Sequence, residues 1–561
     1  MSATLSVMPA EVLLRNARIL DVFSGRFFHG DLAWAQGQIL GFGGETERVV
    51  DVDGAYIIPG LIDSHVHIES SKLSPKEFAK AVLPHGTTAV ISDPHEIANV
   101  LGAEGIRWMI EATKDLPLRV FFMAPSCVPA SPLETPGAVL SAREIQEILS
   151  WERVLGLGEV MNFPGVLAGD PDLWAKLRVA QGRPIDGHAP GLSGSNLWAY
   201  VGAGPKTDHE CTSLSEAEEK LRAGMHILIR EGTTARNLAA LIPILTPSSA
   251  PFVHFCTDDR EPETLLSEGH MDDVLRKAIE AGVPPEVAIS AATIHAARAY
   301  GIPGLGALAP GYRADFLVLS DLKRMKIEQV YVGGKLVAEA GRVVTDLPEI
   351  PPPPSSPMHV HLDRLSFRIP AQDGLARVIR VIPDQVLTEE VLVRPRMEGG
   401  EVLADPKRDL LKIAVVERHR GTGNVGLGLV QGFGLKEGAL ASTVAHDSHH
   451  IVIVGTNDED MKAAVAELAA MGGGQVVVKR EKILAALPLP IAGLMSDRPL
   501  SEVHRLSQEL KKAAKSLGAT LPDPFMSLSF LALPVIPALK ITDLGLVDVR
   551  RFTIVPLWEG G

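Results

Sequence analysis

Two histidines one residue apart close an apolar segment near the start of the chain, where AYIIPGLI is followed by DSHVHIESS at residues 63–71. Residues i and i+2 of a β-strand project from the same face, so His65 and His67 would present their imidazoles side by side. One metal ion could bind both. A two-residue motif also fits buried structural histidines or a strand end without a role, so the rest of the chain must decide.

More ionisable side chains stand where later strand-like segments end. In chain order these are Asp93, His95 and Glu96, then Glu159, His188, His209 with Glu210, Arg230 with Glu231, and Asp258 with Asp259. Gathering so many ionisable groups near one axis costs desolvation free energy unless a cation pairs with them. The pattern therefore predicts a metal site. Imidazole and carboxylate ligands without thiolate suit zinc, iron, manganese or cobalt.

Glu159 stands where a bridging anion would be needed if two metal ions shared this site. Two ions that share a carboxylate would lower the pKa of bound water to near neutral and would polarise the electrophilic carbon of a substrate. A metal-binding protein without catalysis is disfavoured, because Glu159 and Asp258 would supply the bridge and a base together.

The elements that must position these residues alternate between strand and helix. Eight short strand candidates with helical segments between them cover residues 59–67, 87–95, 119–126, 154–161, 183–190, 206–212, 225–232 and 252–259. This alternation is typical of a (β/α)₈ barrel, an α/β fold of the TIM type. Chemistry in such barrels sits at the C-terminal ends of the strands, which is where the ionisable residues fall.

Shorter alternating segments flank the predicted barrel and favour additional domains. Residues 1–58 and 306–350 read as antiparallel strands with glycine and aspartate turns, which we expect to form one composite β-sandwich beside a barrel at 59–305. The proline run at 351–358 would be a stiff linker. Residues 359–561 would form a C-terminal α+β domain.

The motifs resemble the adenine deaminase family of the amidohydrolase superfamily. The matching stretches include PGLIDSHVHIESS, LPHGTTAVISDPHEIANVLG, GLGEVM, DGHAPGLSG, DHECT and REGT, and later TVAHDSHHIVIVG and PLPIAGLMSD. The likeness covers nearly the whole chain, and DPHEIANVLG is not shared by the superfamily at large. His295, in AATIHAARAYG, stands where an asparagine would be expected.

The resemblance implies a set of roles. His65, His67 and Asp258 would hold one divalent metal ion, and His188 and His209 a second. Glu159 would bridge the two ions, and Asp258 would move a proton from water towards the leaving ammonia. Substrate-binding or supporting roles would fall to Asp93, His95, Glu96, Arg230 and Glu231. The metal would be manganese or iron, and the reaction would convert adenine to hypoxanthine and ammonia in purine salvage.

Two questions remain open at this point. The same centre could instead hydrolyse a cyclic amide or another heterocycle. The His-x-Glu and Pro-Cys-x-x-Cys signature of other zinc deaminases is absent. The segment AHDSHH at 445–450, with His446, His449 and His450, could bind metal, be a polar loop before a strand, or border the active site.

Bulk properties restrict the partners. The 561 residues carry a net charge of −14, which argues against nucleic acid or an anionic membrane as the main partner. We see no signal peptide and no run of roughly 18 apolar residues that would span a membrane. Three scattered cysteines do not make a disulfide framework. We therefore expect a cytoplasmic enzyme that acts on adenine and water, assembled as a homo-oligomer, with a dimer as the simplest form.

Overall fold

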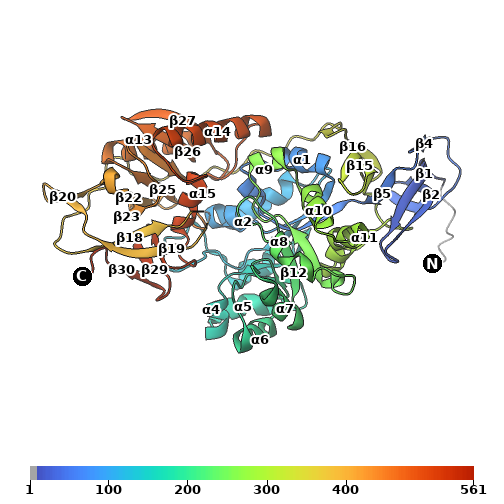
Figure 1. Ribbon diagram of the computed structural model, residues 1–561, viewed down its shortest axis with the longest axis horizontal. Helices are drawn as coiled ribbons and strands as arrows, with labels where there is room; N and C mark the ends of the chain where they lie inside the picture. The colour runs from blue at the N-terminus through green and yellow to red at the C-terminus, as the bar shows by residue number, and fades with distance from the viewer. Residues whose placement is uncertain (1–8, 384, 561) are drawn as a thin grey trace.

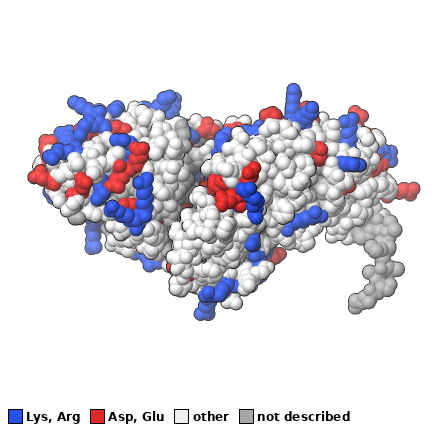
Figure 2. All heavy atoms as spheres, turned by 60° about the horizontal axis from the view of Figure 1, so that its bottom comes forward, with Lys and Arg blue, Asp and Glu red and all other residues white. Residues whose placement is uncertain are grey.

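The computed structural model describes residues 9–383 and 385–560. Residues 1–8, which begin the stretch judged to lack a signal peptide, lie outside the described residues. The molecule is elongated, with a strand-rich part that contains β1 (Val12–Asp21) and β2 (Arg26–Ala35) at one end, a strand–helix part in the middle and the C-terminal part at the other end (Figure 1). In Figure 2 a groove separates the C-terminal lobe from the middle, and acidic and basic side chains are interspersed over this face.

Eight parallel strands occupy the middle part. They are β6 (Leu61–Val66), β7 (Thr87–Ser92), β8 (Arg119–Ala124), β9 (Val154–Val160), β10 (Ile185–Gly187), β11 (Thr207–Asp208), β12 (His226–Arg230) and β13 (Val253–Cys256). One sheet has the order β10-β9-β8-β7-β6 and the other β11-β12-β13. Lys206 N donates to Ile185 O at 2.9 Å, and Asp258 N donates to His65 O at 3.0 Å, so the sheets meet at both edges. The result is a curled parallel sheet consistent with a TIM-like barrel.

A buried polar contact fixes the first strand of this sheet against the last. Thr257, just after β13, donates from Oγ1 to Asp63 Oδ2 at 2.5 Å and from its backbone N to Oδ1 at 3.1 Å. Asp63 is fully buried, and burial raises its pKa to about 6. Because Asp63 precedes His65 by two residues and Thr257 precedes Asp258, this contact sets the register of three predicted ligands.

Helices lie between the strands and cover the sheet. They include α1 (Pro75–Val82), α2 (His95–Ala112), α3 (Ala142–Ile148), α5 (Pro171–Val179), α6 (Gly194–Ala203), α7 (Leu214–Arg222), α9 (Pro262–Ser267), α10 (Met271–Glu280) and α11 (Pro285–Ser290). α3 begins with a capping box in which Ser141 and Glu144 satisfy each other's backbone N–H groups. α10 buries Met271, Val274, Leu275 and Ala278, the i, i+3, i+4, i+7 spacing of an amphipathic helix.

Strands from both flanks of the middle part join in one antiparallel-rich sheet. Its first group is β1 (Val12–Asp21), β2 (Arg26–Ala35), β3 (Gln38–Gly41), β4 (Val49–Asp51) and β5 (Tyr56–Pro59), and its second is β14 (Phe316–Asp321), β15 (Lys326–Val332), β16 (Lys335–Glu339) and β17 (Arg342–Val343). β5 pairs antiparallel with β14 and so unites the groups. Trp34 packs edge-on against Phe316 and Tyr331 at their core.

The C-terminal part contains an eight-stranded sheet of order β19-β18-β23-β22-β25-β24-β26-β27. Its strands are β18 (Ala376–Val381), β19 (Thr388–Val393), β22 (Leu411–Val416), β23 (Val425–Gln431), β24 (Ala439–Ser442), β25 (Ile451–Gly455), β26 (Gly474–Lys479) and β27 (Lys482–Pro488), with helices α13 (Asp458–Met471), α14 (Leu500–Ser516) and α15 (Pro524–Ser529). One buried apolar cluster runs from the middle part into this part. Among the described residues, no helix combines the length and apolar character needed to cross a membrane.

Candidate metal centre

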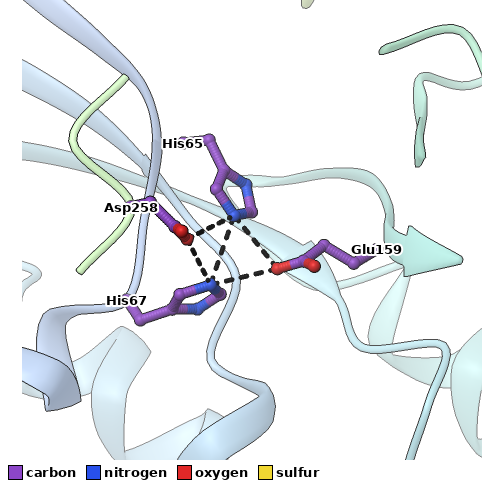
Figure 3. Close-up of side chains that lie close together, drawn as sticks. All are labelled: His65, His67, Glu159 and Asp258. Carbon is purple, nitrogen blue, oxygen red and sulfur yellow. Dashed lines mark hydrogen bonds and ion pairs between the residues drawn. The ribbon is translucent and has the colours of Figure 1, made fainter. Parts of the chain in front are cut away.

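Four side chains converge on one point at the C-terminal ends of the parallel strands (Figure 3). His65 Nε2 lies 3.0 Å from Glu159 Oε1, 3.4 Å from Asp258 Oδ1 and 3.2 Å from His67 Nε2. His67 Nε2 lies 3.0 Å from Glu159 Oε1 and 3.1 Å from Asp258 Oδ1. A tetrahedral ion with ligands at about 2.0 Å holds its ligand atoms about 3.3 Å apart. The four atoms therefore fit around a divalent metal ion.

The tautomer of His67 also suits a metal ligand. Its Nδ1 lies 2.8 Å from the carbonyl oxygen of Asp93, which can only accept a hydrogen bond. Nδ1 therefore carries a proton, and Nε2 is the nitrogen that can bind a metal ion at the centre. Within the part of the chain that the structure describes, Glu159 Oε1 is buried and has no hydrogen-bond partner, as expected for an atom that a cation would satisfy.

The other oxygen of Glu159 faces a second pair of imidazoles. His188 Nδ1 lies 2.7 Å and His209 Nε2 3.5 Å from Glu159 Oε2. The three side chains form a separate group of potential metal ligands. Glu159 thus contributes one oxygen to each group, which is the geometry of a bridging carboxylate.

The two carboxylates of the centre are held in their ionised forms. Burial opposes ionisation of Glu159, but the imidazoles of His209 and His65 outweigh it and hold the pKa of this carboxyl well below its usual range. Burial likewise opposes ionisation of Asp258, and the Arg230 guanidinium then lowers its pKa well below the usual range. Both groups are therefore anions, as metal ligands must be.

Arg230 and Glu231 are neighbours in sequence but have different surroundings. Arg230 Nη1 donates to Asp258 Oδ2 at 2.8 Å, and Nη2 donates to Glu210 Oε2 at 3.1 Å. Glu231 instead pairs with Lys277 of α10 at 3.0 Å. The structure brings Arg230 to the centre and places the Glu231 carboxylate in the network beneath α10.

Asp93 and His95 border the centre on the side of β7. Asp93 Oδ2 accepts the backbone N–H of Glu159 at 2.8 Å. This approach requires glycine at 158, because a Cβ there would lie 2.2 Å from Asp93 Oδ2. His95 Nδ1 lies 3.8 Å from Glu159 Oε1, and its ring centroid is 4.4 Å from that of His67. Asp93 therefore positions Glu159, and His95 stands beside the ligands.

Lys220 is a supporting residue that sequence analysis missed. It lies on α7 with a fully buried side chain and donates to Ala189 O at 2.7 Å and to Asp208 Oδ2 at 2.9 Å. These acceptors adjoin His188 and His209, so Lys220 fixes both ligand-bearing segments. No sequence signal marks it, because LSEAEEKLR has the pattern of a solvent-exposed charged helix.

Two histidines of the segment 445–450 reach the edge of the centre from the C-terminal part. His446 Nδ1 lies 2.7 Å from Glu96 Oε1, and His449 contacts Glu96 Oε2 through Nε2. His450 Nε2 instead lies 2.8 Å from the carbonyl oxygen of Thr135. All three histidines are buried. Among the alternatives left open above, the structure favours a loop that borders the site.

Comparisons with known proteins agree with the two-part sequence pattern. Residues 56–337 match the model of the amidohydrolase family, and residues 385–553 match that of the adenine deaminase C-terminal domain. A protein named adenine deaminase from Desulfatibacillum aliphaticivorans is 50% identical over 98% of this chain and 98% of its own length. Adenine deaminase from Nitratidesulfovibrio vulgaris (strain Hildenborough) is 50% identical, over 97% and 96%. Adenine deaminase 2 from Carboxydothermus hydrogenoformans is 48% identical, over 98% and 97%.

Proposed function

Because this chain belongs to the adenine deaminase family of the amidohydrolases, we propose that its metal centre catalyses the hydrolytic deamination of adenine to hypoxanthine and ammonia. The observation that carries the proposal is the position of Glu159 between two ligand groups, with Asp258 in one of them. A hydrolase of cyclic amides or other heterocycles is the second candidate, since the same arrangement would serve that reaction.

The proposed ligand assignment follows the two groups. His65, His67 and Asp258 would hold one divalent ion, His188 and His209 the other, and Glu159 both. The donor set of imidazole and carboxylate fits manganese(II) or iron(II), which we propose as the native metals. Bound there, such ions would lower the pKa of water and polarise the reacting carbon of the substrate.

The chain's own residues manage the proton. Water adds its oxygen to C6 of adenine, the bond from C6 to the amino nitrogen breaks, and ammonia leaves. Asp258 is the base that accepts the water proton and delivers it to the departing nitrogen. Arg230 binds Asp258 Oδ2 and so fixes the carboxylate in one orientation. His95, beside Glu159, lies where it can contact the substrate ring.

Deamination and metal content test the proposal together. Protein produced with manganese should release ammonia from adenine and give hypoxanthine by mass spectrometry, and it should contain about two metal ions per chain because the ligands exceed one tetrahedral site. Apoprotein prepared with a chelator is the control, and a panel of pyrimidines and cyclic amides tests the second candidate. Full activity at one ion per chain would contradict a bridging role for Glu159.

We also propose the domain division 1–58 with 306–350, 59–305 and 359–561, with 351–358 as linker. It is supported by the pairing of β5 with β14, which joins the two flanks, and by the sheet that begins at β18. The linker runs along the middle part, where Trp108 Nε1 donates to Pro351 O at 3.1 Å.

A further inference from the structure

Resting on the proposed function, we infer that Asp447 is a substrate-binding residue that the C-terminal part contributes to the active site, where its carboxylate accepts an N–H of the five-membered ring of the purine. His446 and His449, on either side of it, bind Glu96 and hold this carboxylate in place. Residues 443–450, the C-terminal loop, connect β24 to β25.

Glu96, His446 and His449 form a group that resembles a metal site, but His449 has the wrong tautomer for one. The backbone N–H of Ala445 donates to His449 Nδ1 at 3.2 Å, so Nδ1 is an acceptor without a proton. Burial outweighs the nearby Glu96 carboxylate and lowers the pKa of His449 to about 4, which keeps the ring neutral. Its single proton is therefore on Nε2, the atom that contacts Glu96 Oε2. This protonated nitrogen faces the carboxylate and has no lone pair for a metal ion.

The C-terminal loop is consequently clamped to the middle part. Glu96 receives one imidazole on each carboxylate oxygen, and both imidazoles come from the loop. Arg418, fully buried, donates from Nε to His449 O at 2.5 Å and from Nη2 to Ala492 O at 2.8 Å. His419 Nε2 lies 2.6 Å from Ser448 O. The backbone that carries Asp447 is thus fixed on both sides before substrate arrives.

Asp447 itself has an unused acceptor. The residue is 3% exposed, and its Oδ2 atom has no hydrogen-bond partner among the described residues. A carboxylate oxygen of Asp447 and ligand atoms of His95 and Glu96 all lie within 4.8 Å of one another. His95 in turn is 3.8 Å from Glu159 Oε1. A free acceptor therefore stands one side chain away from the metal ligands.

A buried carboxylate oxygen without a donor is costly, so it marks a place where a ligand supplies the donor. With C6 and its amino group at the metal ligands, the five-membered ring of adenine points away from them. That ring carries one N–H, which Asp447 can accept. A purine that lacks this N–H would leave the Asp447 carboxylate buried and unpaired. The site would therefore select purines that carry the ring N–H over purines that lack it.

The test combines a change in Asp447 with a change in the substrate. Asp447→Asn should lower kcat/KM for adenine by about 10- to 100-fold, mainly through KM. Methylation of the ring nitrogen, at N7 or N9, should lower kcat/KM of the unaltered enzyme similarly. The effects of the two changes on kcat/KM should not add, because both remove the same hydrogen bond.

Asp543→Asn is the matched control. Asp543 accepts a hydrogen bond from Thr135 N at 2.9 Å in the same contact region. This variant should leave the ratio of kcat/KM for adenine to kcat/KM for methylated adenine unchanged.

Equal losses on adenine and both methylated adenines in Asp447→Asn would overturn the inference. The unaltered enzyme gives an independent test if the variant does not fold. If its kcat/KM for both methylated adenines is within about threefold of that for adenine, the enzyme does not recognise a ring N–H. Failure of the unaltered enzyme to deaminate adenine at all would instead refute the proposed function. Metal analysis should give about two ions per chain. A third ion that is lost in His449→Ala, but not in His450→Ala, would show that Glu96, His446 and His449 bind a metal ion instead of forming the clamp.

Discussion

His67 and His449 use the same side chain in opposite ways, and one hydrogen bond decides each case. The carbonyl oxygen of Asp93 takes the Nδ1 proton of His67, which frees Nε2 for a metal ion. The backbone N–H of Ala445 occupies Nδ1 of His449, which places the proton on Nε2. The group bonded to the far nitrogen, rather than the distance to a carboxylate, therefore separates a metal ligand from a hydrogen-bond donor.

At the scale of the residue, Asp258→Asn is the sharpest test of the base. Asp258 has φ of 56°, a left-handed conformation that asparagine tolerates but alanine does not, so the amide removes the base without straining the backbone. We expect kcat for adenine to fall by at least ~10², while metal content changes less. Steady-state kinetics and metal analysis of the same preparation measure both. Near-normal kcat would show that another group accepts the proton.

At the scale of the element, α7 and α10 act as supports for the ends of the strands. Lys220 of α7 holds the segments that carry His188 and His209. Lys277 of α10 pairs with Glu231 and with Glu268, both at 3.0 Å. Each helix thus ties a lysine to a segment that follows a strand; the Lys220 pair is fully buried, whereas Lys277 is partly exposed.

The ion pairs of Glu268 predict a pH effect on stability. Hydrogen bonds from Arg236, and then from Lys277, lower the pKa of Glu268 from 4.5 to about 2. A folded-state pKa below the unfolded one stabilises the protein above the unfolded value, and this contribution is lost as the pH falls through the folded value. Glu268→Gln should therefore lower the free energy of unfolding at pH 7, and the difference from the unaltered protein should shrink between pH 4.5 and about 2.

Urea unfolding at several pH values measures this difference. Glu280→Gln, at the exposed end of α10, controls for the loss of one negative charge. A Glu268→Gln deficit that stays constant down to pH 3 would mean that it does not arise from the negative charge of Glu268, and no deficit at pH 7 would mean that the pairs with Arg236 and Lys277 do not stabilise the protein.

At the scale of the whole molecule, the C-terminal part and the middle part share one core. The same buried cluster includes Val66 and Phe122 of the middle part and Val452 and Leu510 of the C-terminal part. Removal of residues 359–561 would therefore expose apolar surface and would not test the catalytic role of the C-terminal part cleanly. Point changes at the contact between the parts are more informative.

Lys511 offers such a change. It lies on α14 and donates to Glu263 of α9 at 2.9 Å, and it pairs with Asp523, at the start of α15, at 2.8 Å. Lys511→Met should cost about 1–3 kcal/mol of unfolding free energy, because it leaves Asp523 with a missing partner. It should also raise KM by loosening the contact that seats the C-terminal loop. Lys512→Met, exposed on the same helix, is the control, and equal stability of the two variants would contradict the prediction.

The sequence alone determined the positions of the candidate metal ligands, because the rules that place them are local. Strand alternation put His65 and His67 on one face, and the ends of parallel strands lie at one edge of a sheet. These rules predicted the clustering of His65, His67, Glu159 and Asp258 that the structure shows, although residues 65 and 258 are far apart in the chain.

Tertiary structure alone decided the rest, because those features depend on contacts between distant segments. Arg230 and Glu231 both end one strand, but neighbouring residues point to opposite faces, so only Arg230 faces Asp258. Lys220 looks like a surface residue until its helix is packed. The clamp joins Glu96 to a loop some 350 residues later, and the tautomer of His449 depends on a backbone N–H whose direction only the folded loop sets.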